Sequence, residues 1–160
     1  MVDDISGPGG TSTERLGHQI DAAVNDDSIK TIILDIDSPG GSVAGVPEVA
    51  DKIFKARDKK PVVAVANSMA ASAAYWIGSA AQELVVIPSG MVGSIGVISA
   101  HTDVSKFEEN QGFKTTLITA GKFKAEGNMF EPLGTEALES IQSVVDEYYD
   151  SFVSAVAPGS

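Results

Sequence analysis

A serine within a run of small residues is the first side chain whose surroundings suggest chemistry. Ser72 lies in the segment Asn67-Ser68-Met69-Ala70-Ala71-Ser72-Ala73-Ala74-Tyr75-Trp76, shortly after an apolar run expected to form a strand over residues 62–66. Small side chains let a backbone turn sharply and let a substrate chain come close. The N-terminal amides of a helix starting here would stabilise negative charge developing near the hydroxyl. Ser72 is therefore predicted to be a catalytic nucleophile, and a small-residue packing face is the alternative.

Two glycine-rich turns are candidates for stabilising the oxyanion that such a reaction creates. The turn Ser38-Pro39-Gly40-Gly41 follows a predicted strand, and its glycines permit a backbone whose amides point outward. Such amides could form an oxyanion hole together with the amide that follows the nucleophile. A plain strand-to-helix turn is the alternative. The second turn, Gly93-Ser94-Ile95-Gly96, predicts a bulge in a strand, with Ser94 as a polar side chain that needs a partner.

The proton of the serine needs a base, and the residues alone leave two arrangements open. Lys122 and Lys124 follow Gly121 in an irregular loop, where lysines are usually solvated surface charges. A lysine serves as a general base only if burial lowers its pKa toward the working pH, and a hydroxyl such as Ser94 could orient it. The other arrangement uses His101 as the base with Asp103 orienting it, as in a Ser-His-Asp triad.

The elements that position these residues alternate between helix and strand. We expect helices from a cap at residues 11–13 to Val24, over residues 46–54, after Ser72, over 101–110 and from about Thr135. Strands are expected over residues 31–36, 62–66, 83–87, 92–100 and 113–119, the first covered on both faces. The second helix is expected to turn Phe54 inward, and residues 1–10 and 120–132 to be loops. This order predicts an α/β fold with a largely parallel sheet in one domain spanning residues 1–160.

Composition narrows the functional classes. The net charge of −11 argues against binding nucleic acid or an anionic membrane surface. The chain has no cysteine and two widely separated histidines, so we expect neither a metal site nor a cofactor. No apolar run approaches the length of a membrane span, and a soluble protein without a membrane anchor is expected. The chain opens without an obvious first strand and closes on Ala-Pro-Gly-Ser, so both ends are expected to be trimmed.

Taken together, the motifs resemble the S49 peptidase family, which includes the signal peptide peptidase A group and its phage relatives. They occur in the family's order over nearly the whole chain, and they are Asp37-Ser38-Pro39-Gly40-Gly41-Ser42-Val43, Ala70-Ala71-Ser72-Ala73-Ala74-Tyr75, Val92-Gly93-Ser94-Ile95-Gly96-Val97-Ile98, Gly121-Lys122-Phe123-Lys124 and Tyr148-Tyr149-Asp150-Ser151-Phe152-Val153. The resemblance implies the fold shared by Clp protease and crotonases, with repeated β-β-α units. Residues 98–101 and 124–128 are most similar to phage head-maturation proteases of the lambda type.

The resemblance also implies roles for individual residues. It matches Ser72 to the nucleophile, Lys124 to the general base and Ser94 to the hydroxyl that positions the lysine. The amides of Gly41 and Ala73 match the oxyanion hole. The expected activity is cleavage of protein or peptide substrates through an acyl-enzyme, in a homo-oligomer whose active sites can be shared between subunits. A phage origin implies maturation of the capsid in the cytoplasm of a bacterial host.

Other readings remain at this point. Within the same family, the chain could be a bacterial peptidase that degrades signal peptides. A crotonase-like acyl-CoA enzyme would use the same pair of amides for a thioester enolate and would not need a serine at position 72. An inactive assembly scaffold would have no reason to keep both Ser72 and Lys124. The sequence departs from the family at Ala73-Ala74, where glycines are more usual.

Overall fold

The computed structural model describes residues 10–157, which divide into two compact units. Unit 1 consists of the described chain up to Gly96 together with the chain from Tyr149 onward, and unit 2 is Val97–Tyr148. The loop expected over residues 1–10 lies, except for Gly10, outside the described residues.

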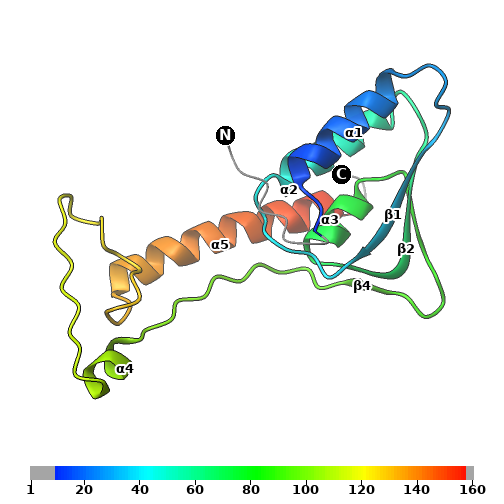
Figure 1. Cartoon of the computed structure of the whole chain (residues 1–160). Helices are drawn as coiled ribbons and strands as arrows, with labels where there is room; N and C mark the ends of the chain where they lie inside the picture. Colours follow the sequence, from blue (N-terminus) through cyan, green and yellow to red (C-terminus); the bar gives the residue numbers. More distant parts are fainter. Residues whose placement is uncertain (1–9, 158–160) are drawn as a thin grey trace. The chain divides into compact units, whose positions relative to one another are not determined.

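Unit 1 is built on a parallel sheet whose central strand is β2 (Val62–Ala71). The strand β1 (Ile32–Ser38) pairs with one side of β2. On the other side, β3 (Glu83–Val86) pairs with the first half of β2, and β4 (Met91–Gly93) pairs with its end. All three pairings are parallel (Figure 1). The prediction of an α/β fold with a largely parallel sheet is confirmed.

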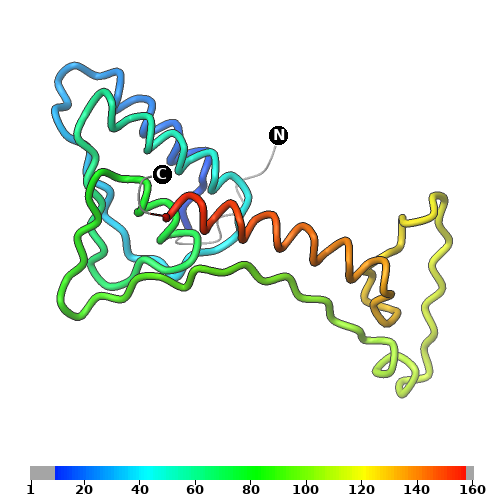
Figure 2. The backbone as a smooth tube through the Cα atoms, turned by 180° about the vertical axis from the view of Figure 1, so that it is seen from behind, coloured from blue at the N-terminus to red at the C-terminus, as the bar shows by residue number. Residues whose placement is uncertain are grey.

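Three helices cover one face of this sheet: α1 (Thr13–Asn25), α2 (Val46–Ala56) and α3 (Ala73–Ser79). Figures 1 and 2 show α1 and α2 running side by side. The expected cap of the first helix is confirmed, because the Ser12 hydroxyl accepts a hydrogen bond from the Arg15 amide. The core between helices and sheet is apolar and includes Ile20, Leu34, Val49, Ile53, Val62, Ala64, Trp76 and Phe152.

The other face of the sheet has no covering helix among residues 10–157. Ile32 is 7% exposed, whereas its neighbour Ile33 is 67% exposed, because successive side chains of a strand point to opposite faces. The expectation that the first strand is covered on both faces is therefore wrong for the described chain. Phe54 is a second correction: it is 42% exposed at the end of α2, and the Arg57 guanidinium lies over its ring.

Unit 2 contains a short helix, α4 (Ser105–Asn110), and most of the long helix α5 (Thr135–Val156). Two expected strands are wrong. Residues 113–119 are extended but pair with no strand of the described chain, and the strand expected over 92–100 ends at Gly93. His101 also precedes the helix in which it was expected. Extended chain becomes a sheet only when a neighbouring strand accepts its hydrogen bonds, and the described chain supplies none here.

Unit 2 has almost no core of its own. Within Val97–Tyr148 only Ala137 is buried, and the described side chains of Ile98, Phe107, Phe113, Ile118 and Phe123 are all more than half exposed. The helical spacing of the apolar residues of α5 predicts a stripe that is core or, alternatively, an oligomer seam. Its last member, Phe152, is buried in unit 1, whereas Leu138 is 52% exposed. No helix among residues 10–157 is long and apolar enough to cross a membrane.

Candidate active site

Ser72 lies at a sharp corner between the end of β2 and the start of α3. Its backbone has φ 52° and ψ −125°, a conformation that is uncommon and strained for any residue other than glycine. The Ser72 amide donates to the Gly93 carbonyl at 2.8 Å, and the Ser72 carbonyl accepts from the Trp76 amide at 3.0 Å. Its hydroxyl does not cap the helix that follows. The backbone is thus held at both ends while the hydroxyl stays available.

Gly40, in the turn after β1, packs closely against this corner. A β-carbon built on Gly40 would lie 2.8 Å from the Ser72 β-carbon and 3.0 Å from the Ala73 nitrogen. Gly40 has φ 99°, and its own amide donates to the Ser38 hydroxyl at 3.2 Å. The turn after β1 therefore touches the turn after β2, which the parallel pairing of these two strands makes possible.

The amides of Gly41 and Ala73 are the two predicted members of an oxyanion hole. Within residues 10–157, neither amide donates a hydrogen bond to another protein group. Gly41 follows the glycine that contacts Ala73, so both amides belong to the same corner. Because α3 has only seven residues, individual amides rather than a long helix dipole would stabilise charge there.

Ser94 is brought to this corner by its neighbour Gly93, which was not assigned a role from the sequence. The Gly93 carbonyl accepts the Ser72 amide, and Ser94 follows with φ 57°. Ser94 is exposed. In the sequence, the pair Gly93-Ser94 is the only signal for this contact. The positive φ of Ser72 and Ser94 cannot be recognised from the residue type.

The two lysines of the Gly121 loop differ in their contacts. Lys122 forms an ion pair with Glu136 at 3.2 Å and lies over the Phe123 ring at 4.4 Å. Lys124 is exposed and, within the described chain, has no ion pair. Lys122 is therefore occupied by neighbours of its own, whereas the amine of Lys124 is available.

His101, the alternative base, is half-buried in unit 2. Its Nε2 lies 2.7 Å from the Asn128 carbonyl oxygen, which can only accept a hydrogen bond and so requires a proton on Nε2. Asp103 accepts the Ser105 amide at 2.8 Å, and no hydrogen bond within residues 10–157 joins it to His101. The hydroxyl and amide of Ser105 hold the pKa of Asp103 below its ordinary value. Asp103 thus accepts a hydrogen bond at the start of α4, and the nearby His101 adds a smaller electrostatic contribution to its lowered pKa.

The predicted site residues fall into two groups. Ser72, Gly41, Ala73 and Ser94 belong to unit 1, where two turns and the end of β4 meet around Ser72. Lys124 and His101 both belong to unit 2. The described structure therefore brings Ser72 together with the two candidate oxyanion amides, and the catalytic roles of Ser72, Lys124 and His101 stay predictions.

Comparison with known proteins gives consistent matches. A model of Peptidase family S49 matches residues 55–160, and a model of Clp protease matches residues 9–96. The chain is 39% identical over 139 residues to capsid assembly protease C of Escherichia phage lambda, covering 87% of this chain and 32% of that protein. It is 38% identical over 135 residues to the head-tail preconnector protein GP5 of Enterobacteria phage P21, and the match covers 84% of this chain and 27% of that protein.

A cellular protein is also similar. The chain is 30% identical over 158 residues to protease 4 of Salmonella typhi, covering 98% of this chain and 25% of that protein. The chain thus spans about a third or less of the length of these relatives. The Clp protease match covers the strands of unit 1, in agreement with the observed parallel sheet. Because the S49 model matches well over half of the residues, including Ser72, Ser94 and Lys124, the chain belongs to peptidase family S49.

Proposed function

We propose that this chain carries the catalytic core of a serine endopeptidase in which Ser72 is the nucleophile and Lys124 the general base. The main support is the corner at Ser72, where a strained backbone carries a hydroxyl that does not cap α3 and adjoins two amides that have no acceptor among residues 10–157. A strained turn that presents a serine beside free amides is the usual arrangement for attack on an acyl group.

The reaction follows from these groups. The Ser72 oxygen attacks the peptide carbonyl while its proton passes to the neutral amine of Lys124, and the Gly41 and Ala73 amides stabilise the oxyanion. The carbon–nitrogen bond then breaks, and the departing amine takes the proton from the Lys124 ammonium. The remaining acyl group is esterified to Ser72. Lys124 next removes a proton from water, and the resulting hydroxide attacks the ester carbonyl. The bond from the carbonyl carbon to the Ser72 oxygen then breaks, the Lys124 ammonium returns its proton to that oxygen, and the carboxylic acid is released.

The exposure of Lys124 adds a condition to this mechanism. An ammonium in water stays charged near neutral pH, and only desolvation or a nearby cation makes it neutral enough to accept a proton. Lys124 is exposed in the single chain. We propose that it becomes buried in a homo-oligomer, with Ser94 as the hydroxyl that positions its amine.

The substrate proposed is a protein chain of a phage capsid, cleaved during head maturation in the cytoplasm of a bacterial host. Support comes from the similarity to the capsid assembly protease of phage lambda, which is higher than the similarity to protease 4.

Cleavage of an unfolded protein substrate tests the proposal. We would compare the wild-type chain with Ser72→Ala, Lys124→Ala and His101→Ala, using Lys122→Ala as the matched control, and record the oligomer mass of each. We expect loss of cleavage in the first two variants and retention in the last two. Loss of cleavage in His101→Ala together with retention in Lys124→Ala would mean that His101, not Lys124, is the general base. Cleavage that survives Ser72→Ala would remove the proposed nucleophile.

A further inference from the structure

The loop between β1 and α2 carries one of the two candidate oxyanion amides. This oxyanion loop consists of residues 39–45, and Gly41 lies in its first half. The amides of Gly41, Ser42 and Val43 donate to no acceptor among residues 10–157. No backbone amide in the middle of the loop is therefore fixed by a hydrogen bond, and the direction of the Gly41 amide depends on how the two ends of the loop are held.

The start of the oxyanion loop is held by the sheet. The Gly40 amide donates to the Ser38 hydroxyl at 3.2 Å, and Ser38 is the last residue of β1, where it pairs with Ala70 of β2. Gly40 also packs against Ser72, so that an added β-carbon would lie 2.8 Å from the Ser72 β-carbon. The first end of the loop is thus fixed next to the proposed nucleophile.

The other end of the oxyanion loop is held by α1. The hydroxyl of Thr13, the first residue of α1, donates to the Ala44 carbonyl at 3.2 Å. Gly45 follows with φ 75° and is the residue at which α2 begins. A β-carbon added to Gly45 would lie 2.5 Å from the Thr13 hydroxyl oxygen and 3.0 Å from the Thr13 β-carbon. Thr13 therefore holds this end by a hydrogen bond and by close packing.

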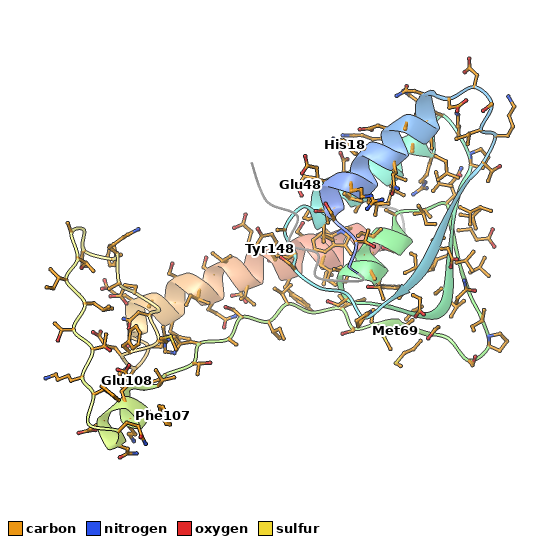
Figure 3. The ribbon with its side chains drawn as sticks, in the orientation of Figure 1. His18, Glu48, Met69, Phe107, Glu108 and Tyr148 are labelled. Atoms are coloured by element: carbon orange, nitrogen blue, oxygen red, sulfur yellow. The ribbon has the colours of Figure 1, made fainter. Side chains whose placement is uncertain are left out.

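Thr13 has a firm support, because α1 is packed along α2. Further along the two helices, Asp21 of α1 forms an ion pair with Lys52 of α2. This ion pair and the Thr13 contact together show that the helices run in the same direction, with their starts adjacent. Figure 3 labels His18 on α1 and Glu48 on α2. A side chain at the start of α1 can therefore hold the chain that leads into α2.

We propose that Thr13 is a positioning residue of the oxyanion hole. By holding the Ala44 carbonyl and packing against Gly45, it keeps the Gly41 amide directed at the oxygen of the tetrahedral intermediate. The inference rests on the proposed function, which gives the Gly41 amide that task. Only residues 41–43 separate the end held by Thr13 from the end fixed at Gly40, so a displacement at Ala44 reaches Gly41.

The effect of this contact on the reaction appears in the transition state. A donor of an oxyanion hole contributes fully only when it is already in place, because no reorganisation is then needed during the reaction. Misplacement of a reacting or stabilising group by about 1 Å can cost about 10²-fold in rate. Since the Gly41 amide would bind the oxyanion rather than the intact substrate, loosening the loop should slow the chemical step and leave substrate affinity unchanged.

Three variants and two measurements test the proposal. Thr13→Val removes the hydroxyl and keeps the shape of the side chain, and Thr13→Ser keeps the hydroxyl. Ser28→Ala is the matched control, because it removes a hydroxyl hydrogen bond in the turn after the other end of α1. Relaxation of the ¹⁵N-labelled protein gives the order parameter of the Gly41 amide. Titration with a serine-reactive fluorophosphonate gives the maximal labelling rate of Ser72 and the half-saturating concentration.

Both measurements should change in Thr13→Val alone. We expect the order parameter of the Gly41 amide to fall from about 0.85 in the wild type to less than about 0.6 in this variant. Its maximal labelling rate should fall by about 10–100-fold, with an unchanged half-saturating concentration. Thr13→Ser and Ser28→Ala should match the wild type in both measurements.

The outcomes separate positioning from mere stability. An order parameter of Gly41 in Thr13→Val equal to that of the wild type would overturn the proposal, and so would a mobile Gly41 amide with an unchanged labelling rate. A slower labelling rate in Thr13→Ser or in Ser28→Ala would also overturn it, because the loss would then not follow the hydroxyl of Thr13. Failure of the proposed function looks different: Ser72 of the wild type would take no label, while the order parameter would still decide whether Thr13 holds the loop.

Discussion

Gly40 packs directly against Ser72, so that a β-carbon on residue 40 would lie 2.8 Å from the β-carbon of the proposed nucleophile. The same added atom would lie 2.8 Å from the Ala71 carbonyl oxygen, and the φ of Gly40 is 99°. Contacts this close involve backbone on both sides, and backbone cannot move aside as a flexible side chain can. The glycine after β1 is therefore required by the position of the serine after β2.

Gly40→Ala should consequently destabilise the chain and displace Ser72. We expect a loss of about 1–3 kcal/mol in the free energy of unfolding, from overpacking and the unfavourable φ. Urea denaturation measures the loss. Gly41→Ala is the matched control for stability, since a β-carbon there meets nothing within 4 Å. Equal stability of the two variants would contradict the close contact of the two turns.

The neighbouring isoleucines of β1 give a second prediction. Ile32→Ala removes a side chain that is 7% exposed and should cost about 2–5 kcal/mol, as buried aliphatic truncations do. Ile33→Ala removes one that is 67% exposed and should cost less than about 1 kcal/mol. The comparison is made by urea denaturation at low protein concentration. A similar cost for both would mean that the open face of the sheet is covered in solution.

The aromatic pair that packs the end of α5 against α3 gives a third prediction. Trp76 and Phe152 stack with ring centres 4.7 Å apart and an interplanar angle of 7°. Phe152→Ala should cost about 3–5 kcal/mol, and Phe152→Leu clearly less. Trp76 is the single tryptophan of the chain, so its fluorescence reports the change directly. Val153→Ala is the control, because the neighbouring Val153 is 39% exposed. If Val153→Ala lowered the free energy of unfolding as much as Phe152→Ala does, the assigned packing of Phe152 would be wrong.

A fourth prediction concerns acid stability. Hydrogen bonds from the Ser28 hydroxyl and amide hold the pKa of Asp26 below its ordinary value of 3.8. A carboxyl with a lowered folded pKa stabilises the protein above the unfolded pKa, and this contribution is lost as the pH falls through the folded pKa. Ser28→Ala should therefore lower stability at pH 6, and the difference from wild type should shrink below pH 3.8.

Unfolding free energies of both proteins, measured from pH 2 to pH 6, check this prediction. Asp27→Asn is the control on the same turn, because no hydrogen bond to the Asp27 carboxylate holds it in the described structure. A difference between wild type and Ser28→Ala that stays constant across the whole range would contradict the assigned role of Asp26.

Much of unit 1 was predictable because its signals are local. The alternation of apolar runs with capped amphipathic stretches locates α1, α2 and the strands β1 to β3. The wrong predictions for unit 1 concerned the burial of single side chains. Phe54 fits the apolar stripe of α2 but is 42% exposed beneath the Arg57 guanidinium, and Ile33 is 67% exposed because no helix among residues 10–157 covers it. Which face of a strand is covered depends on elements elsewhere in the fold.

Unit 2 was less predictable for a physical reason. The composition of residues 113–119 is that of a strand, but strand formation requires a partner that the described chain does not provide. Of the candidate site, the serine and its glycine turns could be placed by residue type and order. The positive φ of Ser72 and Ser94 could not, since serine rarely adopts it and only the surrounding contacts impose it.

The identity of the nucleophile and its base is tested most directly by covalent labelling. Intact mass after treatment with a serine-reactive fluorophosphonate should show one adduct, and peptide mapping should place it on Ser72. The labelling rate should fall by about 10²–10⁴ in Lys124→Ala, the usual contribution of a general base, and stay unchanged in Lys122→Ala and His101→Ala. An adduct on another residue, or a full rate in Lys124→Ala, would contradict the Ser72–Lys124 dyad.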